Sequence, residues 1–274
     1  MPSKASPDFF VAQVMGILNV TPDSFSDGGL HLPFDSALKH AERMVDEGAA
    51  IIDVGGESTR PGAREVSEAE ELDRVIPVIE GICRRIPVLV SVDTCKPAVM
   101  REAVAHGAGM INDVFALRKE GALETAARLG VPVCLMHMQG TPRDMQHAPS
   151  YGDVVAEVKA FLVERIAAAV DSGIPWERII IDPGFGFGKN VQHNLSLIRE
   201  LRQFVDLGCP VLVGLSRKSM LGAILGRELD QRVHGSVAAA TLAAWAGARI
   251  IRAHDVAATV DALRFVQAVR GDGQ

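Results

Sequence analysis

Eight times along this chain, a short apolar segment without helical spacing ends in polar residues and is followed by an amphipathic stretch. The first stops at Asn19 and continues into a loop rich in Thr, Pro, Asp, Ser and Gly. Segments that are apolar on both faces are typical of parallel strands covered by helices. The predicted strands are 12–19, 50–55, 87–93, 109–112, 131–136, 178–182, 210–215 and 249–253.

Helical patterns fill the stretches between these strands. Residues 34–48 space apolar side chains by three and four and end at a glycine, whereas 67–85 opens with the capping-box pair Ser67 and Glu70. The predicted helices are 34–48, 67–85, 97–105, 120–129, 152–172, 192–207, 232–246 and 256–270.

This alternation predicts a single (β/α)8 TIM barrel, an α/β fold, over 12–274, preceded by an N-terminal extension, 1–11. The alternative is a doubly wound open sheet. Such a sheet would usually have a Gly-rich first strand-to-helix turn, and GxGxxG is absent from that turn.

Composition narrows the classes of partner and compartment. A net charge of −6 gives no support for a general nucleic-acid surface. The N-terminus lacks the apolar core of a signal peptide, and the apolar run near Ile51 is far shorter than the roughly 20 residues that span a bilayer. The four cysteines form no CxxC pair and are expected to be reduced. We therefore expect a cytoplasmic protein without nucleic-acid or membrane partners.

Polar residues end the predicted strands, at the edge where barrels of this class carry their active sites. Helix capping explains any one of them, but a set of unpaired buried charges would cost several kcal/mol each. Asp93, Asn112 and Asp182, with Lys218, suit a flat heterocycle that has several N–H and carbonyl groups. A second set suits an anion and consists of Asn19, Arg252 and His254, with Arg60 and Arg217. No nucleophile-and-base pair or zinc-type spacing occurs.

The chain also contains a series of longer motifs in a fixed order. They are NVTPDSFSDGG, GGESTRPGA, SVDT, NDV, MHMQGTP, DPGFGFGK, SRKS and R-x-HDV. With these motifs the chain resembles the dihydropteroate synthases from Val14 to about Val256. The resemblance implies condensation of p-aminobenzoate with 6-hydroxymethyl-7,8-dihydropterin diphosphate to 7,8-dihydropteroate and diphosphate. It also implies Mg²⁺ as cofactor and a homodimer.

The same resemblance implies roles for individual residues. The pterin ring is expected to meet Asp93, Asn112, Met136, Asp182 and Lys218. The diphosphate is expected to meet Asn19, Arg252 and His254, with Asn19 also at the metal. The p-aminobenzoate site is expected to contain Thr59, Arg60, Pro61, Phe187, Arg217 and Ser219. The catalytic set is expected to be Asp93 and Lys218 with Phe25 and Asp27 of the loop Val20–Gly29, which is expected to close over the substrates.

Two other functions share part of this pattern. A methyltransferase barrel that carries methyltetrahydrofolate would have the Asp/Asn/Asp cluster, but it needs neither SRKS nor a diphosphate site. A non-catalytic pterin-binding paralogue is the second alternative, and the intact first loop argues against it.

Overall fold

The eight predicted strands form one parallel sheet in the computed structural model, which describes residues 11–21, 32–58, 62 and 66–271. The sheet order is β6-β5-β4-β3-β2-β1-β8-β7, and a bridge between Ile181 and Val211 joins its two ends. The Ile181 N–H donates to the Pro210 carbonyl at 3.0 Å. The sheet is therefore a nearly closed barrel, as predicted, and the open-sheet alternative is wrong. The strands are β1 (Gln13–Asn19), β2 (Ile51–Gly55), β3 (Leu89–Asp93), β4 (Met110–Asp113), β5 (Val133–Met136), β6 (Ile179–Asp182), β7 (Leu212–Val213) and β8 (Ile250–Ala253).

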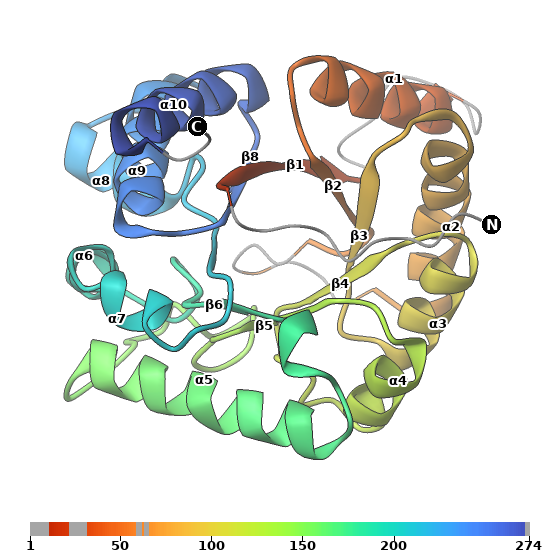
Figure 1. Ribbon diagram of the computed structural model, residues 1–274, viewed down its shortest axis with the longest axis horizontal. Coiled ribbons are helices and arrows are strands. Elements are labelled where there is room, and N and C mark those ends of the chain that lie inside the picture. Colours follow the sequence, from red (N-terminus) through yellow and green to blue (C-terminus); the bar gives the residue numbers. More distant parts are fainter. Residues whose placement is uncertain (1–10, 22–31, 59–61, 63–65, 272–274) are drawn as a thin grey trace.

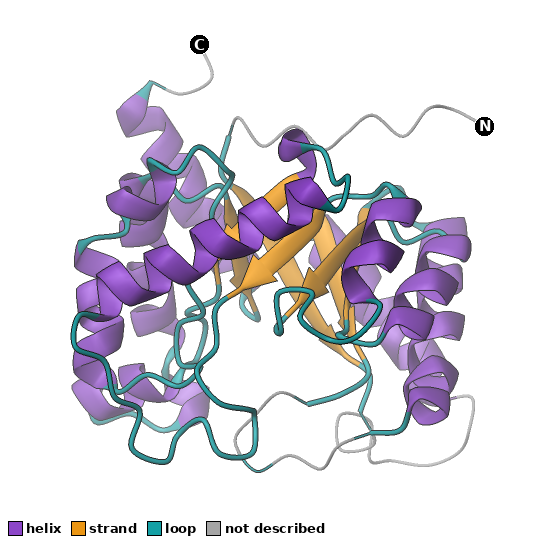
Figure 2. Cartoon of the chain, turned by 90° about the horizontal axis from the view of Figure 1, so that it is seen from below, coloured by secondary structure: helices purple, strands orange, loops and turns teal. Residues whose placement is uncertain are grey.

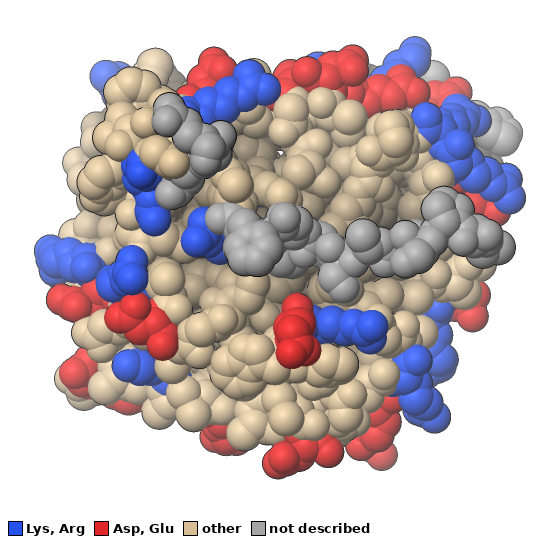
Figure 3. Space-filling view, viewed as in Figure 1, with Lys and Arg blue, Asp and Glu red and all other residues tan. Residues whose placement is uncertain are grey.

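The helices surround the barrel (Figure 1). They are α1 (Leu32–Asp46), α2 (Glu68–Arg85), α3 (Pro97–Ala105), α4 (Ala122–Leu129), α5 (Val154–Asp171), α6 (Val191–Arg199), α7 (Arg202–Val205), α8 (Ser219–Leu225), α9 (Val233–Ala246) and α10 (Val256–Arg270). Among the described residues, none of these helices is long and apolar enough to cross a membrane. Charged side chains lie mainly around the circumference of the face in Figure 3, where both signs are interspersed.

Three elements differ from the sequence-based expectation. The predicted helix 192–207 is divided into α6 and α7, because the backbone leaves the helical region at Glu200. Leu197, Leu201 and Phe204 are all buried at a spacing that also fits one continuous helix, so the apolar pattern did not reveal the break. The strand 210–215 is shorter than predicted, at Leu212–Val213, and the following Gly214 lines a cavity. The short helix α8 was not among the eight predicted helices.

The interior of the barrel changes from apolar to polar along the strands. Its apolar layer consists of Met15, Ile51, Met110, Cys134, Ile180, Leu212 and Ile250. Because side chains two residues apart share a strand face, the next inward positions on β2, β4 and β6 are Asp53, Asn112 and Asp182. The larger core lies between the strands and the helices. The apolar layer therefore closes one half of the barrel, and polar groups fill the half toward the loops at the lower edge of Figure 2.

Candidate active site

A cavity of about 490 Å³ opens at the carboxyl ends of the strands. Its polar lining includes Asn19, Asp93, Asn112, Asp182, Lys218, Arg252 and His254. Its apolar lining includes Ile17, Val114, Met136, Met145, Phe185 and Phe187. The structure thus brings together residues from all eight predicted strand ends, including the SRKS and DPGFGFGK segments.

Strand register places three of the polar side chains side by side. Asn19 pairs with Gly55, Gly55 with Asp93, and Asp93 with Asn112. A Cβ atom on Gly55 would lie 3.7 Å from both Asn19 Oδ1 and Asp93 Oδ2, so these oxygens flank the glycine from either side. The glycine leaves room for both side chains to face the cavity.

Arg252 is held between two carboxylates inside the barrel. Its Nε donates to Asp53 Oδ2 at 2.6 Å, and its Nη2 donates to Asp93 Oδ2 at 3.0 Å. Asn112 Nδ2 donates to the same Asp53 oxygen at 3.1 Å. Asp53 is fully buried, so it acts from below the cavity and orients both Arg252 and Asn112.

Two acids at the cavity are held in an environment that disfavours their charge. Burial, reinforced by the negative charge of Asp53, raises the pKa of Asp93 to about 7 although Arg252 opposes the shift. Burial also raises the pKa of Asp182 to about 6, despite the Gly184 N–H that donates to its Oδ1 at 2.7 Å. Both groups can change charge within the physiological pH range, which is common at functional sites.

Lys218 supplies a cation on the opposite wall of the cavity. Burial and the neighbouring Arg252 lower its pKa to about 8. Its Nζ lies 4.0 Å from the centroid of the Phe187 ring, which is a cation–π contact. The ammonium therefore contacts an aromatic side chain of the β6–α6 loop.

The β6–α6 loop, 183–190, is tied to the end of β5. Lys189 is 2% exposed, and its Nζ contacts the Gly184 carbonyl at 2.9 Å and the Phe187 carbonyl at 3.0 Å. It also lies 2.9 Å from His137 Nδ1. His137 in turn packs edge-on against Phe161.

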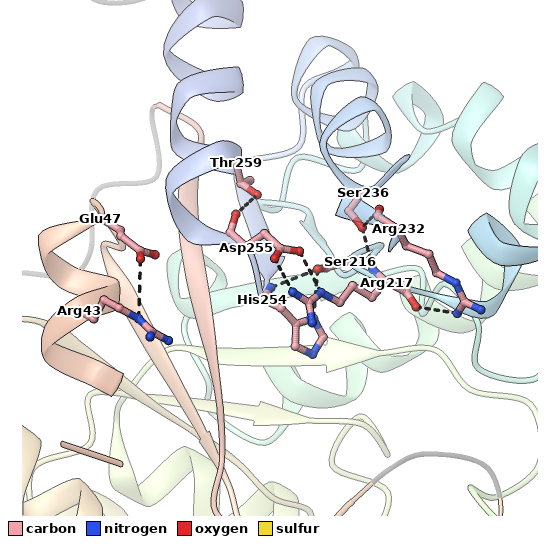
Figure 4. Close-up of polar contacts among 9 residues, drawn as sticks. All are labelled: Arg43, Glu47, Ser216, Arg217, Arg232, Ser236, His254, Asp255 and Thr259. Atoms are coloured by element: carbon pink, nitrogen blue, oxygen red, sulfur yellow. Dashed lines mark hydrogen bonds and ion pairs between the residues drawn. The ribbon is translucent and has the colours of Figure 1, made fainter. Parts of the chain in front are cut away.

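Arg217 and His254 lie at the cavity with their side chains already engaged (Figure 4). Arg217 donates to both Asp255 oxygens, at 3.0 Å from Nε and 2.5 Å from Nη2. His254 Nδ1 lies 3.0 Å from the Ser216 hydroxyl, which also accepts the His254 N–H at 3.1 Å. If the hydroxyl donates to Nδ1, the imidazole proton is on Nε2.

A second ion cluster lies where the β2–α2 segment leaves the cavity wall. Lys96 donates to both Glu57 and Glu71, and Glu57 accepts the Val66 N–H at 3.4 Å. Glu57 lines the cavity, whereas Glu71 is buried. These contacts hold the two ends of the segment that carries GGESTRPGA.

The motifs indicated no role for Asp53, Ser216, Lys189 or Glu57. Asp53 had a detectable signal, because a charged residue within the apolar strand IIDVG needs a buried partner. Phe25, Asp27, Thr59, Arg60 and Pro61 lie outside the described residues, as does most of the loop Val20–Gly29 and of the extension 1–11. All four cysteines are free, and three of them are buried.

Comparisons with known proteins converge on one family. The model of the pterin-binding enzyme family matches residues 15–254. The dihydropteroate synthase of Escherichia coli is 57% identical over 263 residues, which cover 96% of this chain and 93% of that protein. The Yersinia pestis dihydropteroate synthase, solved with a sulfonamide drug, has a TM-score of 0.94 at 53% identity, covering 99% of this chain and 98% of the other. The Xanthomonas albilineans dihydropteroate synthase with 4-aminobenzoic acid has a TM-score of 0.91 at 58% identity, covering 96% and 94%.

The environment of Asp93 makes a prediction about folding stability. Its folded pKa of about 7 lies above the ordinary value, so between about pH 4 and pH 7 the folded protein keeps a proton that the unfolded chain loses. Stability from this group is therefore present at low pH and is lost as pH rises toward 7. Asn does not titrate, so the variant lacks this loss. We therefore expect the unfolding free energy of Asp93→Asn, measured relative to the wild type, to rise by roughly 1–2 kcal/mol as the pH increases from 5 to 8.

Urea unfolding at several pH values measures this difference. Asp261→Asn, at an exposed position on α10, is the matched control and is expected to leave the pH dependence unchanged. A pH-independent difference between Asp93→Asn and the wild type would contradict the placement of a costly charge at this position.

Proposed function

This chain belongs to the pterin-binding enzymes and, among them, to the dihydropteroate synthases, and we propose how its cavity performs their reaction. The reaction joins p-aminobenzoate to 6-hydroxymethyl-7,8-dihydropterin diphosphate and releases diphosphate. The observation that carries the proposal is the convergence of Asp93, Asn112, Asp182 and Lys218 in one cavity.

We place the pterin ring in the inner part of the cavity. The carboxylates of Asp93 and Asp182 can accept hydrogen bonds from the ring N–H and amino groups, and Lys218 can donate to a ring acceptor. Asn112 is oriented by Asp53, and Met136 supplies an apolar wall. These fixed donors and acceptors explain selectivity for a flat heterocycle rather than for an apolar ligand.

We place the diphosphate near Asn19, Arg252 and His254. A His254 proton on Nε2 would serve as a donor to the leaving group. Arg252 is engaged by Asp53 and Asp93, so it links the pterin carboxylate to the anion rather than serving the anion alone.

The donor set also fits Mg²⁺ that arrives with the substrate. Within the described residues, no group of three or more His, Cys, Asp or Glu side chains could hold a metal ion by itself. Mg²⁺ commonly binds one or two protein oxygens together with substrate phosphates, and Asn19 offers an amide oxygen at the cavity. When bound there, Mg²⁺ neutralises charge that develops on the departing diphosphate.

We place p-aminobenzoate at the outer end, between Phe187 and Ser219. The Ser219 hydroxyl can donate to the carboxylate of this substrate. Arg217, held by Asp255, contributes positive charge at the rim. The roles of Thr59, Arg60, Pro61, Phe25 and Asp27 stay predictions.

The proposed chemistry begins with cleavage of the bond between the pterin CH₂ and the diphosphate oxygen. The bonding electrons leave with diphosphate, and the positive charge that remains is delocalised into the pterin. Asp93 offsets this charge electrostatically, and the arylamine nitrogen then attacks the CH₂ group and releases a proton. Because both reactants are held in one cavity, positioning replaces a strong base in this step.

We also propose a homodimer and a cytoplasmic location. α9 and α10 lie side by side (Figure 1). Four large apolar side chains on these two helices are exposed. These are Leu242 (57% exposed), Trp245 (55%), Phe265 (70%) and Val269 (57%). An apolar surface of this kind suits a second copy of the chain. The free cysteines suit a reducing compartment, which cell fractionation can test.

The proposed function predicts Mg²⁺-dependent formation of 7,8-dihydropteroate by the purified protein. Chelation by EDTA is expected to lower the rate at least tenfold, and added Mg²⁺ is expected to restore it. Product formation is measured by chromatography, with reactions lacking p-aminobenzoate as the control. No product with both substrates and Mg²⁺ would instead support a non-catalytic pterin-binding paralogue.

The two shifted groups at the pterin site predict a narrow pH optimum. Asp93 must be ionised to accept ring hydrogens, so kcat/KM for the pterin substrate falls below about pH 7, the pKa of Asp93. Lys218 must be protonated to donate, so kcat/KM falls above about pH 8, the pKa of Lys218. Lys218→Arg, which stays charged, is expected to be slower but to lack the alkaline decline. Retention of that decline in the variant would remove Lys218 as its cause.

The proposed dimer predicts a change of mass when its apolar surface is charged. Phe265→Glu is expected to convert the protein to a monomer at micromolar concentration, because a carboxylate at this position would be buried without a partner. Sedimentation velocity measures the mass. Val163 on α5, which is 47% exposed and lies outside α9 and α10, is the control position, where Val163→Glu should leave the mass unchanged. A dimeric Phe265→Glu variant would contradict this interface.

A further inference from the structure

Lys189 is a buried cation that the proposed reaction does not use. It lies at the end of the DPGFGFGK motif, immediately before α6, and is 2% exposed. Its Nζ has four acceptors within hydrogen-bond distance. They are the carbonyls of Gly184 (2.9 Å), Phe187 (3.0 Å) and His137 (3.4 Å) and the His137 Nδ1 atom (2.9 Å).

The arrangement satisfies the ammonium and the loop backbone at the same time. A buried ammonium costs several kcal/mol unless its protons are hydrogen-bonded, and Lys189 has more acceptors than protons. The Gly184 carbonyl also accepts the Phe187 N–H at 3.1 Å, so Lys189 adds a second hydrogen bond to that turn and bonds the Phe187 carbonyl as well. Burial and the nearby Lys189 lower the pKa of His137 to about 3, so its ring is neutral and Nδ1 can accept.

The loop that Lys189 holds has no room to shift toward β5. Gly184 has a φ of +69°, and a Cβ atom there would lie 1.8 Å from the His137 carbonyl oxygen. Gly188 has a φ of +62°, and its Cβ would lie 2.5 Å from the Gln139 carbonyl oxygen. The loop therefore lies directly against the end of β5, and Lys189 fastens it from within.

The same loop carries one wall of the cavity. Phe187 follows Gly184 by three residues, lines the cavity and contacts the Lys218 ammonium through its ring face. Lys189 bonds the backbone carbonyl of Phe187 itself. A displacement of this carbonyl would move the ring within the cavity.

We propose that Lys189 is a positioning residue for the acceptor substrate: by fixing the Phe187 backbone, it holds the ring against which the aromatic amine lies. The inference rests on the proposed function, because that function places p-aminobenzoate beside Phe187. The Asp182 backbone is set by its strand pairing with Met136, and the loop adds one hydrogen bond to its side chain, from the Gly184 N–H at 2.7 Å. We therefore expect the pterin end to depend on Lys189 less than the Phe187 ring does.

The test is a double-mutant cycle on the full-length protein with both substrates. Lys189→Met removes the three donors at similar length, and Phe187→Ala removes the ring. We expect each single change to raise the KM for p-aminobenzoate about tenfold while changing the KM for the pterin diphosphate less than threefold. Because Lys189 acts through Phe187, the double variant is expected to resemble Phe187→Ala rather than to show the product of the two effects.

Two further variants separate positioning from general loosening. Tyr151→Phe removes a hydroxyl that donates to the Gly188 carbonyl at 2.8 Å on the same loop, and it is expected to leave both KM values within twofold. Lys189→Gln keeps two amide donors and is expected to give a smaller rise in the same KM. This milder variant also carries the test if Lys189→Met does not fold.

The outcomes distinguish the inference from the function on which it rests. Multiplicative effects in the double variant, or equal rises in both KM values, would overturn the role of Lys189 and leave a purely structural lysine. An unchanged KM for p-aminobenzoate in Phe187→Ala would overturn the placement of that substrate, and the inference with it. The inference would be supported if Lys189→Met raised the KM for p-aminobenzoate alone, and if adding Lys189→Met to Phe187→Ala raised that KM no further.

Discussion

The arginine that Asp53 and Asp93 hold inside the barrel is the interaction on which the rest of the site depends. A guanidinium at this depth needs carboxylate partners, and two carboxylates this close need a cation between them. Asp53 adds a third member by accepting from Asn112. The network thereby fixes one strand-end residue from each of β3, β4 and β8. Removing Arg252 would leave Asp53 and Asp93 close together without the cation between them, so these groups stabilise one another as a unit.

The barrel can contain this network because its interior is divided into two halves. Ile51, Met110 and Ile250 belong to the apolar layer, and the positions two residues later on their strands are the polar residues Asp53, Asn112 and Arg252. The apolar layer excludes water from one side of the charges, whereas the cavity leaves the other side open to ligand. The alternation of side chains along the strands therefore puts an apolar layer at one end of the barrel and the polar groups at the other.

The sequence predicted the strand ends well because burial on both faces and a polar terminus are local signals. Asp93, Asn112 and Asp182 lie where their strands end, and their strands begin and end within two residues of the predicted bounds. The pairings were not predictable in the same way. Arg217 was expected near an anion, yet its guanidinium is bound by Asp255, 38 residues further along the chain. Asp53 and Arg252 are 199 residues apart, and only the closed barrel brings them together. The division of 192–207 into α6 and α7 also left no trace in its apolar spacing.

The shifted acids and lysines share one physical cause, since burial disfavours the charged form of each. It raises the pKa of Asp93 to about 7 and of Asp182 to about 6, and it lowers the pKa of Lys218 to about 8 and of Lys189 to about 7. Near neutral pH, the buried acids and lysines of the free protein are therefore close to the point at which each loses its charge. A pterin ring that donates to the acids and accepts from Lys218 would stabilise the charged forms of both. Binding would then relieve part of the cost that folding incurs, which is the physical sense in which this cavity is prepared for its ligand rather than for its own stability.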